Sequence, residues 1–444
     1  YTHRLLDARK NHNWAIAGSG VRPSDGLQRE KLLAQDCLTT LIELDPASTS
    51  AEVCGAMIDY LPVEPSNDAL IAYMARPEIR IVSLTVTEGG YYRDAATGGF
   101  DAKHPEIRHD AAHPAEPRTA FGAMIAALRL RRDNGVGPFT CMSCDNLQDN
   151  GAVLHQTLTS LARMSDPELA EWIDANCSFP NSMVDCIVPA TGPKEIALAA
   201  AFGIADNAPV THENFRQWVI EDSFCAGRPA WEDAGAVLTN EVELYETMKI
   251  RMLNGGHQII AAAGDLMGLE TIAETMAHPG LNALMRKVET EEIAPHVAPV
   301  PDMTPLAYLE LITGRFSNKE IFDTTRRVAF DGSSRQPGFI IPSIRDGLES
   351  GTSIEGLALV SATWARYCQG HREDGSTIAP NDPHWDELKK VAQEAAGAPM
   401  RWLEMTRYYG DLGENPRFAK AFCQSLNRIQ NDGLAAALQE YLNP

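Results

Sequence analysis

Hydrophobic residues follow two different patterns along the chain. In the first half, short β-rich runs alternate with segments of helical periodicity, which predicts an α/β fold with a largely parallel sheet. Strands are expected at 14–21, 79–86 and 138–143, and helices at 118–132 and 151–164. A further helix is expected from Asp25, with Leu27, Leu32 and Leu33 toward the core.

The pattern changes near residue 240. From there the chain consists mainly of long helical stretches such as 241–267 and 353–368, and strand signals become rare. We therefore expect two domains, an α/β cofactor domain over residues 1–240 and a mainly α-helical substrate domain over residues 241–444.

Charge and composition exclude several classes of protein. A formal net charge of −22 over 444 residues argues against binding to nucleic acid or to an anionic membrane. No apolar run is long enough to span a bilayer, and the first residues do not resemble a signal peptide, so a cytoplasmic protein is expected. Nine cysteines do not suggest a disulfide framework, and Cys141 and Cys144 are interpreted as core thiols rather than as a zinc or redox site.

The strongest chemical signal lies in 248–257. On an α-helix, Lys249 and His257 would lie ~80° apart and Asn254 ~60° beyond His257, so the three side chains can converge on one cavity. The pair Gly255 and Gly256 costs roughly 1 kcal/mol per glycine in a helix interior, which indicates close approach by a backbone or a ligand. The alternative is a solvated lysine, a capping asparagine and a core histidine.

A second group of polar residues follows the predicted strands. Glu88, Asn146 and Asp185 each come directly after a hydrophobic run. Ligands of open α/β sheets bind outside the carboxyl ends of the strands, so these residues could line one crevice. Taken singly, each could equally be a turn residue or a helix cap.

These residue types suit the oxidation of an alcohol. The reaction needs a base for the hydroxyl proton, a hydride acceptor, and donors that stabilise the alkoxide-like oxygen. A buried lysine can act as the base, because burial lowers its pKa toward neutrality. Asn146 and Asn254 would suit the oxygen, and His257 could hold a second hydroxyl or orient Lys249. The scheme needs no metal.

Several blocks of the sequence resemble the mannitol dehydrogenase family, the long-chain polyol-specific dehydrogenases and reductases. The resemblance covers essentially the whole chain. Its most specific parts are residues 81–91, 142–146, 178–185 and 331–337, together with the spacing Lys249-x4-Asn254-x2-His257.

The resemblance implies a role for each matching residue. Lys249 would be the general base, while Asn146 and Asn254 would hold the reacting oxygen. Glu88, close to both substrate and cofactor, would help to move the proton to solvent. The residues expected to contact substrate hydroxyls are His257, Asp185, Arg327 and Arg335. The family fold is a Rossmann-type amino-terminal domain followed by a mainly α-helical carboxyl-terminal domain, and its members are commonly monomeric and work without zinc.

The choice of cofactor depends on Asp25 and Arg22. After the first predicted strand, Asp25 would accept hydrogen bonds from the adenosine ribose and would repel a 2′-phosphate, which favours NAD. Arg22 could weaken that repulsion, so NADP stays open. Asp25 could instead be the N-cap of the next helix.

The chain departs from the family pattern at two places. A glycine-rich turn that opens the family's first unit would lie upstream of Tyr1, and without it we expect weak NAD binding. Cys186 stands where the family usually has an arginine, which puts the local charge around Asp185 in doubt.

The expected reaction is the interconversion of a hexitol such as mannitol and its ketose with NAD, by a monomer without a metal. Within the family the alternatives are a fructuronate/mannonate oxidoreductase, with Arg327 and Arg335 clamping the carboxylate, and an arabinitol-type pentitol dehydrogenase. From other classes, a non-catalytic binding protein has no use for Lys249 and both asparagines, and a zinc hydrolase lacks the His-x3-His spacing.

Overall fold

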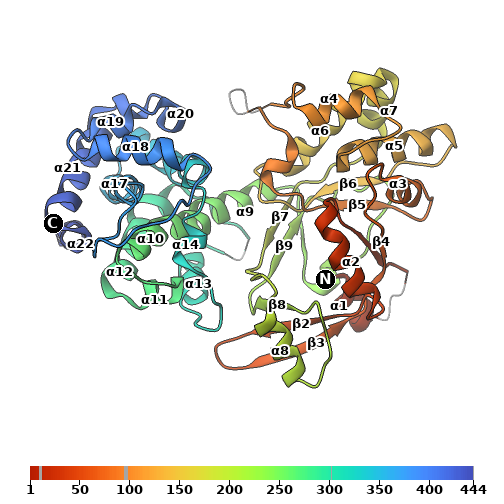
Figure 1. Ribbon diagram of the computed structural model, residues 1–444, viewed down its shortest axis with the longest axis horizontal. Helices are drawn as coiled ribbons and strands as arrows, with labels where there is room; N and C mark the ends of the chain where they lie inside the picture. Colours follow the sequence, from red (N-terminus) through yellow and green to blue (C-terminus); the bar gives the residue numbers. More distant parts are fainter. Residues whose placement is uncertain (10–12, 95–98, 302, 444) are drawn as a thin grey trace. The chain divides into compact units, whose positions relative to one another are not determined.

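The computed structural model describes residues 1–9, 13–94, 99–301 and 303–443. These residues form two compact units, Tyr1–Glu243 and Leu244–Pro444. Figure 1 shows strands only in the first unit, whereas the second consists of helices. In the described part of the chain, none of the helices combines the length and the apolar character needed to cross a membrane.

The strands of the first unit form four small sheets, and most of their pairings are parallel. Parallel pairs join β1 to β4, β2 to β8, β5 to β6 and β9 to β10, while β2 with β3 and β7 with β9 are antiparallel. This confirms the expectation of a largely parallel α/β unit. The strands are β1 (Ile16–Ser19), β2 (Thr39–Leu44), β3 (Thr49–Cys54), β4 (Met57–Leu61), β5 (Ile81–Leu84), β6 (Thr140–Ser143), β7 (Ser182–Asp185), β8 (Val210–Glu213), β9 (Gln217–Ile220) and β10 (Val237–Leu238).

Helices α5 and α6 pack with β5 and β6 around the main core of this unit (Figure 1). Large side chains such as Phe121 and Phe139 are fully buried in this core. The helices are α1 (Thr2–Arg9), η1 (Pro23–Asp25), α2 (Gly26–Leu33), α3 (Asp68–Met74), η2 (Glu88–Tyr91), α4 (Pro105–Ala112), α5 (Ala120–Asp133), α6 (Asn150–Ser165), α7 (Pro167–Asn176), α8 (Pro193–Ala201) and η3 (Trp231–Ala234). Helix α9 (Val242–Met248) begins in this unit and continues into the second.

Two of the leucines expected in the core are exposed. Leu32 of α2 is buried, but Leu27 is 67% and Leu33 38% exposed. At ~100° per residue an eight-residue helix turns these three side chains in different directions, and only Leu32 packs with Met57 and Tyr60. The prediction that all three face the core was therefore wrong.

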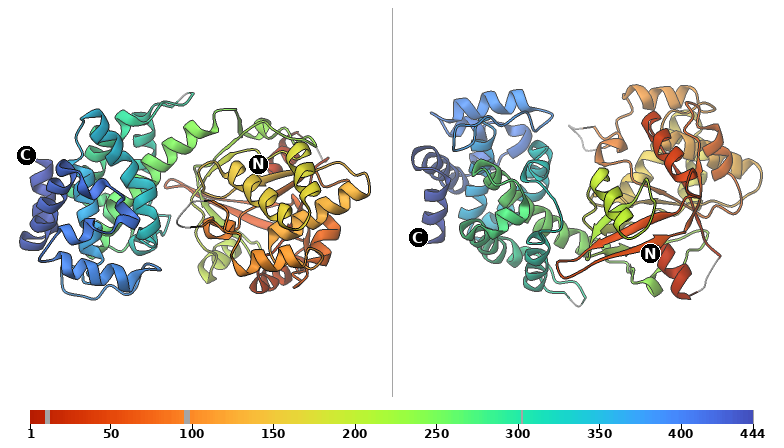
Figure 2. Two further views of the ribbon diagram at one scale, coloured as in Figure 1. Left: turned by 90° about the horizontal axis from the view of Figure 1, so that it is seen from above. Right: turned by 60° about the horizontal axis from the view of Figure 1, so that its bottom comes forward.

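The second unit is built around α10, whose residues are buried along nearly its whole length and which packs against α11, α12, α14 and α17 (Figure 2). The small side chains Ala261, Ala262 and Ala263 let these helices approach closely. The helices are η4 (Lys249–Asn254), α10 (Gly255–Leu266), α11 (Ile272–Ala277), α12 (Pro279–Val288), η5 (Glu289–Ile293), η6 (Ala294–His296), α13 (Pro305–Phe316), α14 (Thr325–Val328), α15 (Gly332–Arg335), η7 (Gln336–Ile340), α16 (Ile341–Ser350), α17 (Glu355–Tyr367), α18 (Trp385–Ala395), α19 (Met400–Leu403), α20 (Thr406–Tyr409), η8 (Leu412–Glu414), α21 (Pro416–Asp432) and α22 (Leu434–Leu442).

Three of these segments are π-helices, in which hydrogen bonds span five residues rather than four: η4, η5 and η7. They lie far apart in the sequence, yet η4 contacts both of the others. Single-turn π segments of this kind are frequent at functional sites, so this region of the helical unit is a candidate functional site.

Candidate functional site

Asp145 organises the carboxyl ends of β5 and β6. Its buried carboxylate accepts hydrogen bonds from the backbone amides of Val86 (3.0 Å) and Thr87 (2.9 Å) and from the hydroxyl of Tyr91 (2.7 Å). Burial, followed by the hydrogen bond to Asp145, raises the pKa of the Tyr91 phenol well above its usual range, so it remains a donor. The loop that follows β5 is therefore fixed to the loop that follows β6.

The backbone of this loop is strained at Thr87. This β-branched residue has a φ of 66°, a left-handed conformation that such residues rarely adopt. A conformation of this kind costs on the order of 1–3 kcal/mol and persists only where the surroundings impose it, as Asp145 does here. Glu88 begins the short helix η2 directly afterwards, and its side chain lies outside the described part of the structure.

Asn146 follows β6, and Asp185 ends β7, a strand of a different sheet. Asn146 is exposed four residues before the start of α6, while Asp185 is buried. Asn150 joins the end of β6 to the start of β7, because its side-chain nitrogen donates to the carbonyls of Asp145 (3.0 Å) and Ser182 (2.7 Å). These contacts tie together the strand ends that carry Glu88 and Asn146 and the start of β7, while Asp185 lies at the opposite end of β7.

Asp25 follows β1, in a sheet separate from that of β5 and β6. Its Oδ2 atom accepts hydrogen bonds from the backbone amides of Val21 (3.0 Å) and Arg22 (2.9 Å), and this fixes the turn after the strand. The carboxylate does not cap α2, because its side chain makes no hydrogen bond to that helix. Arg22 is exposed beside it.

In the second unit, Lys249 and Asn254 are the first and last residues of the π-helix η4. Gly255 donates its amide to the carbonyl of Ile250, five residues earlier. The angles expected for a regular α-helix therefore do not apply between Lys249 and His257, because the π turn inserts an extra residue between them. Lys249 is only 7% exposed, which excludes a freely solvated lysine.

His257 is the third residue of α10, and its ring stacks on Phe316 with centroids 4.0 Å apart. Its Nε2 atom is buried and makes no hydrogen bond to protein. Burial, and then the charges of Arg327, Arg315 and Arg335, lower the pKa of His257 well below its usual value. The imidazole is therefore neutral, and the expected residues Arg327 and Arg335 lie close enough to affect it.

Of the two glycines that open α10, Gly256 is approached closely, whereas Gly255 meets its neighbour at an ordinary contact distance. A Cβ at Gly256 would lie 3.0 Å from Oε1 of Glu289, and one at Gly255 would lie 3.5 Å from the carbonyl oxygen of Phe339. These neighbours belong to η5 and η7, so the two glycines are the points at which the three π-helices meet.

Arg327 and Arg335 are both tied to neighbouring groups. Arg327 donates through Nε (2.6 Å) and Nη2 (2.5 Å) to the buried carboxylate of Asp323, which compensates its charge. Arg335 donates to the carbonyl of Val328, which also accepts from the amide of Gln258 (3.1 Å). Through Val328, Arg335 is thus linked to Gln258, the residue that follows His257.

Several residues that build these arrangements were not singled out from the sequence, namely Asp145, Asn150, Gln258, Glu289 and Asp323. Only Asp145 gave a signal, since it lies beside Asn146 in a block that follows a strand. Among the described residues, no group of three or more His, Cys, Asp or Glu side chains is arranged to hold a metal ion.

Comparison with known families identifies both units. The mannitol dehydrogenase Rossmann domain matches residues 2–233, and the mannitol dehydrogenase C-terminal domain matches residues 241–430.

Curated relatives match over the full chain. Mannitol 2-dehydrogenase of Cereibacter sphaeroides is 55% identical over 442 residues, covering 100% of this chain and 92% of the relative. Mannitol 2-dehydrogenase of Aspergillus terreus is 38% identical, covering 100% of this chain and 90% of the relative.

Solved structures agree with these matches. The Pseudomonas fluorescens mannitol 2-dehydrogenase in ternary complex with NAD and D-mannitol is 40% identical with a TM-score of 0.90, and the match covers 100% of this chain and 91% of that one. A substrate-free D-sorbitol dehydrogenase is 34% identical with a TM-score of 0.89, covering 98% of this chain and 90% of that one.

Proposed function

Because the chain belongs to the mannitol dehydrogenase family and is an oxidoreductase, we propose that it oxidises a mannitol-like sugar alcohol to its ketose with NAD, and catalyses the reverse reaction. The observation that carries the proposal is the full-length match to an enzyme whose complex holds both NAD and D-mannitol. The polar residues described above supply the groups that this reaction needs.

Lys249 is proposed as the general base that takes the hydroxyl proton. An amine removed from water favours its neutral form, which can accept a proton. Lys249 is buried at the start of η4, and Asn254 ends the same π-helix. Asn254 would donate to the reacting oxygen without adding charge, and the family resemblance gives the same role to Asn146. Proton transfer by an amine needs no metal, so we propose a metal-independent reaction.

NAD would supply the hydride acceptor, and the first unit offers residues that fit it. Dinucleotides bind outside the carboxyl ends of parallel strands, where the strained, Asp145-fixed loop after β5 carries Glu88. Asp25 would accept from the adenosine ribose through Oδ1, since Oδ2 already holds the amides of Val21 and Arg22. A carboxylate here repels a 2′-phosphate, so we favour NAD over NADP even with Arg22 nearby.

The remaining residues are proposed to contact substrate hydroxyls. His257 is neutral, and its unpartnered Nε2 is the ring atom that remains for a hydroxyl group. Arg327, Arg335 and, in the first unit, Asp185 would hold further hydroxyls. Because Asp323 compensates the charge of Arg327, a neutral polyol is favoured over a hexonate such as mannonate, which would need an uncompensated arginine.

The test replaces the proposed base. Lys249→Ala should lower kcat for mannitol oxidation about 10²- to 10⁴-fold, the usual contribution of a general base. NADH binding, measured by fluorescence titration, should be unchanged. Lys287→Ala is the matched control, because Lys287 lies in the same unit and its ammonium group contacts Tyr441, donating to the carbonyl of that residue (2.9 Å).

Two results would contradict the proposal. The first is a Lys249→Ala variant with the turnover of the wild type. The second is a higher kcat/KM for mannonate or for arabinitol than for mannitol. An assay after chelation tests metal independence separately, and loss of activity there would refute that part alone.

A further inference from the structure

A short segment of the helical unit, residues 379–382, clamps the segment 326–335 that carries both substrate-contacting arginines. We call residues 379–382 the strap and residues 326–335 the arginine segment. Arg326 donates from its guanidinium to the carbonyls of Ala379 (3.0 Å) and Pro380 (2.7 Å). At the other end, Asp382 accepts from the amide and the hydroxyl of Ser333, both at 2.8 Å.

Asn381 is the centre of the clamp. Its side-chain nitrogen donates to the backbone carbonyl of Arg326 (2.8 Å) and to the hydroxyl of Tyr367 (3.0 Å). Its backbone carbonyl accepts from the backbone amide of Asp331 (3.1 Å). Asn381 is only 6% exposed, so these bonds are shielded from water. Arg327 directly follows the carbonyl of Arg326 and precedes the amide of Asp331, the two backbone groups that Asn381 binds.

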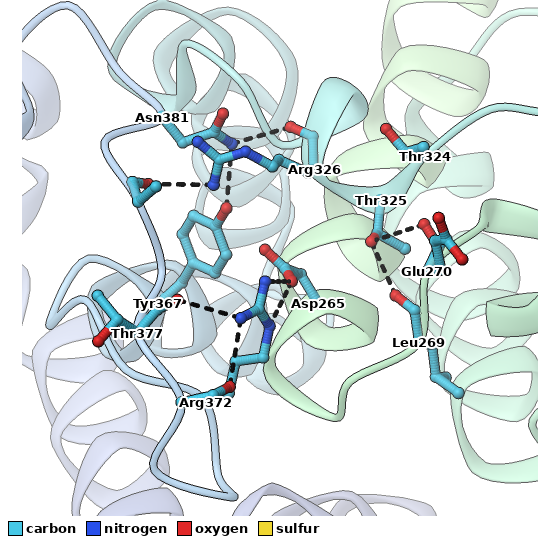
Figure 3. A network of polar contacts seen from close by, with 12 residues as sticks. Asp265, Leu269, Glu270, Thr324, Thr325, Arg326, Tyr367, Arg372, Thr377 and Asn381 are labelled. Atoms are coloured by element: carbon cyan, nitrogen blue, oxygen red, sulfur yellow. Dashed lines mark hydrogen bonds and ion pairs between the residues drawn. The ribbon is translucent and has the colours of Figure 1, made fainter.

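The same network reaches the helix that carries His257. Arg372 donates to the buried carboxylate of Asp265 on α10 at 2.7 Å, and to the carbonyl of Thr377 at 3.2 Å, four residues before Asn381. Burial and then the negative charge of Asp265 raise the pKa of Tyr367 well above its usual range, so its hydroxyl keeps its proton. Figure 3 shows Tyr367 between Asn381, which bonds to its hydroxyl, and the pair formed by Arg372 and Asp265.

Thr325, the residue directly before the arginine segment, is bound to residues that follow α10. Thr325 donates its hydroxyl to the carbonyls of Leu269 (2.9 Å) and Glu270 (3.2 Å), and its amide to Glu270 (2.9 Å). The segment is therefore held from two sides, by residues that follow α10 and by the strap. Without the strap only the attachments on the α10 side would remain, those of Thr325 and the bond from Gln258 to the carbonyl of Val328.

We propose that the strap is the positioning element for Arg327 and Arg335, and that Asn381 is its key residue. The inference rests on the proposed function, in which these arginines contact hydroxyls of the polyol. Asn381 touches neither substrate nor cofactor in this scheme. It sets the backbone from which Arg327 extends, so its loss weakens polyol binding more than it slows the chemical step.

The experiment compares two variants of Asn381 with a matched asparagine. Asn381→Ala removes the side chain, and Asn381→Asp keeps its size but removes both N–H donors. Asn282→Ala is the control, because Asn282 makes one comparable bond in the same unit, to the carbonyl of Met276 (3.0 Å), away from the strap. Both Asn381 variants should raise KM for mannitol about tenfold, as expected from the loss of one or two hydrogen bonds. The kcat and the KM for NAD should stay within about threefold, and Asn282→Ala should leave all three constants unchanged.

A double-mutant cycle separates this inference from the proposed function. In an Arg327→Ala background, the effect of Asn381→Ala on KM should shrink, because the two residues act through one group. If Arg327→Ala raises KM but neither Asn381 variant does, or if the Asn381 effect is undiminished in that background, the strap inference is wrong and the proposed function stands. If Arg327→Ala leaves KM for mannitol unchanged, the assigned role of Arg327 fails, and the inference fails with it.

Discussion

Two neutral titratable groups flank Gly256. Glu289 is fully buried, both of its carboxyl oxygens lack a hydrogen-bond partner, and burial raises its pKa well above the ordinary value of 4.5. His257 is neutral for the opposite reason, since burial and nearby arginines lower its pKa. The start of α10 thus presents uncharged groups on both sides, in keeping with a site for an uncharged sugar alcohol.

Replacing Glu289 should change how stability depends on pH. The folded-state pKa is raised, so the contribution of the protonated carboxyl is fully present below about pH 4.5 and is lost as the pH rises. Glu289→Gln stays neutral at every pH, so its free energy of unfolding should exceed that of the wild type by an amount that grows from pH 5 to pH 8. The difference should grow by at most ~1.4 kcal/mol per pH unit, the limit for one proton that the unfolded chain releases and the folded protein retains.

Urea unfolding at several pH values measures this difference. Glu291→Gln, an exposed residue of the same π-helix, should show no such growth with pH. A Glu289→Gln difference that is constant across the range would mean that Glu289 is not buried as an acid.

At the scale of elements, α10 depends on small residues wherever a neighbour comes close. A Cβ at Gly264 would collide with the hydroxyl of Thr275 and would lie 3.0 Å from the methyl group of Thr325. At Gly255 the nearest atom is a carbonyl oxygen 3.5 Å away, an ordinary contact. The two glycines occupy one helix but meet different constraints.

This difference predicts opposite outcomes for the same substitution. Gly264→Ala should lower the free energy of unfolding by about 1–3 kcal/mol, because buried neighbours must move. Gly255→Ala should raise it by up to about 1 kcal/mol, through better helix propensity. Thermal unfolding monitored by circular dichroism compares the two, and an undiminished stability of Gly264→Ala would show that the helix does not approach Thr275 as described.

At the scale of the whole molecule, the sequence predicted the class of fold and much of the local structure. Hydrophobic periodicity alone located strands β5 and β6 and helices α5 and α6 to within about three residues. It did not predict the π-helix η4, because the extra residue in that turn is accommodated by packing against η5 and η7, far away in sequence. Periodicity also failed for Leu27 and Leu33, which lie on a helix with a single buried position.

The candidate site was predictable only where its residues are local. Lys249, Asn254 and His257 share one stretch of chain, and Asn146 follows a strand, so spacing pointed to them. Asn381 is more than fifty residues from Arg327, and its role depends on backbone carbonyls that no sequence pattern marks. Asp323 likewise has an ordinary helix-preceding position, and only the structure shows that it neutralises Arg327.

The net charge of −22 should make stability depend on salt. At ~0.01 M ionic strength the screening length is ~30 Å, so carboxylates across each unit repel one another, whereas at ~0.15 M it falls to ~8 Å. Surface ion pairs such as Arg428 with Asp432 would weaken with salt, but each contributes only ~0.2–1 kcal/mol. With 60 acidic residues against 38 basic ones, repulsion should dominate, and Tm should rise by a few degrees between these two conditions.

Scanning fluorimetry in NaCl at pH 8 measures the rise in Tm. The rise should shrink at pH 5.5, where exposed histidines become charged. A fall in Tm with salt would show that the ion pairs outweigh the excess of negative charge.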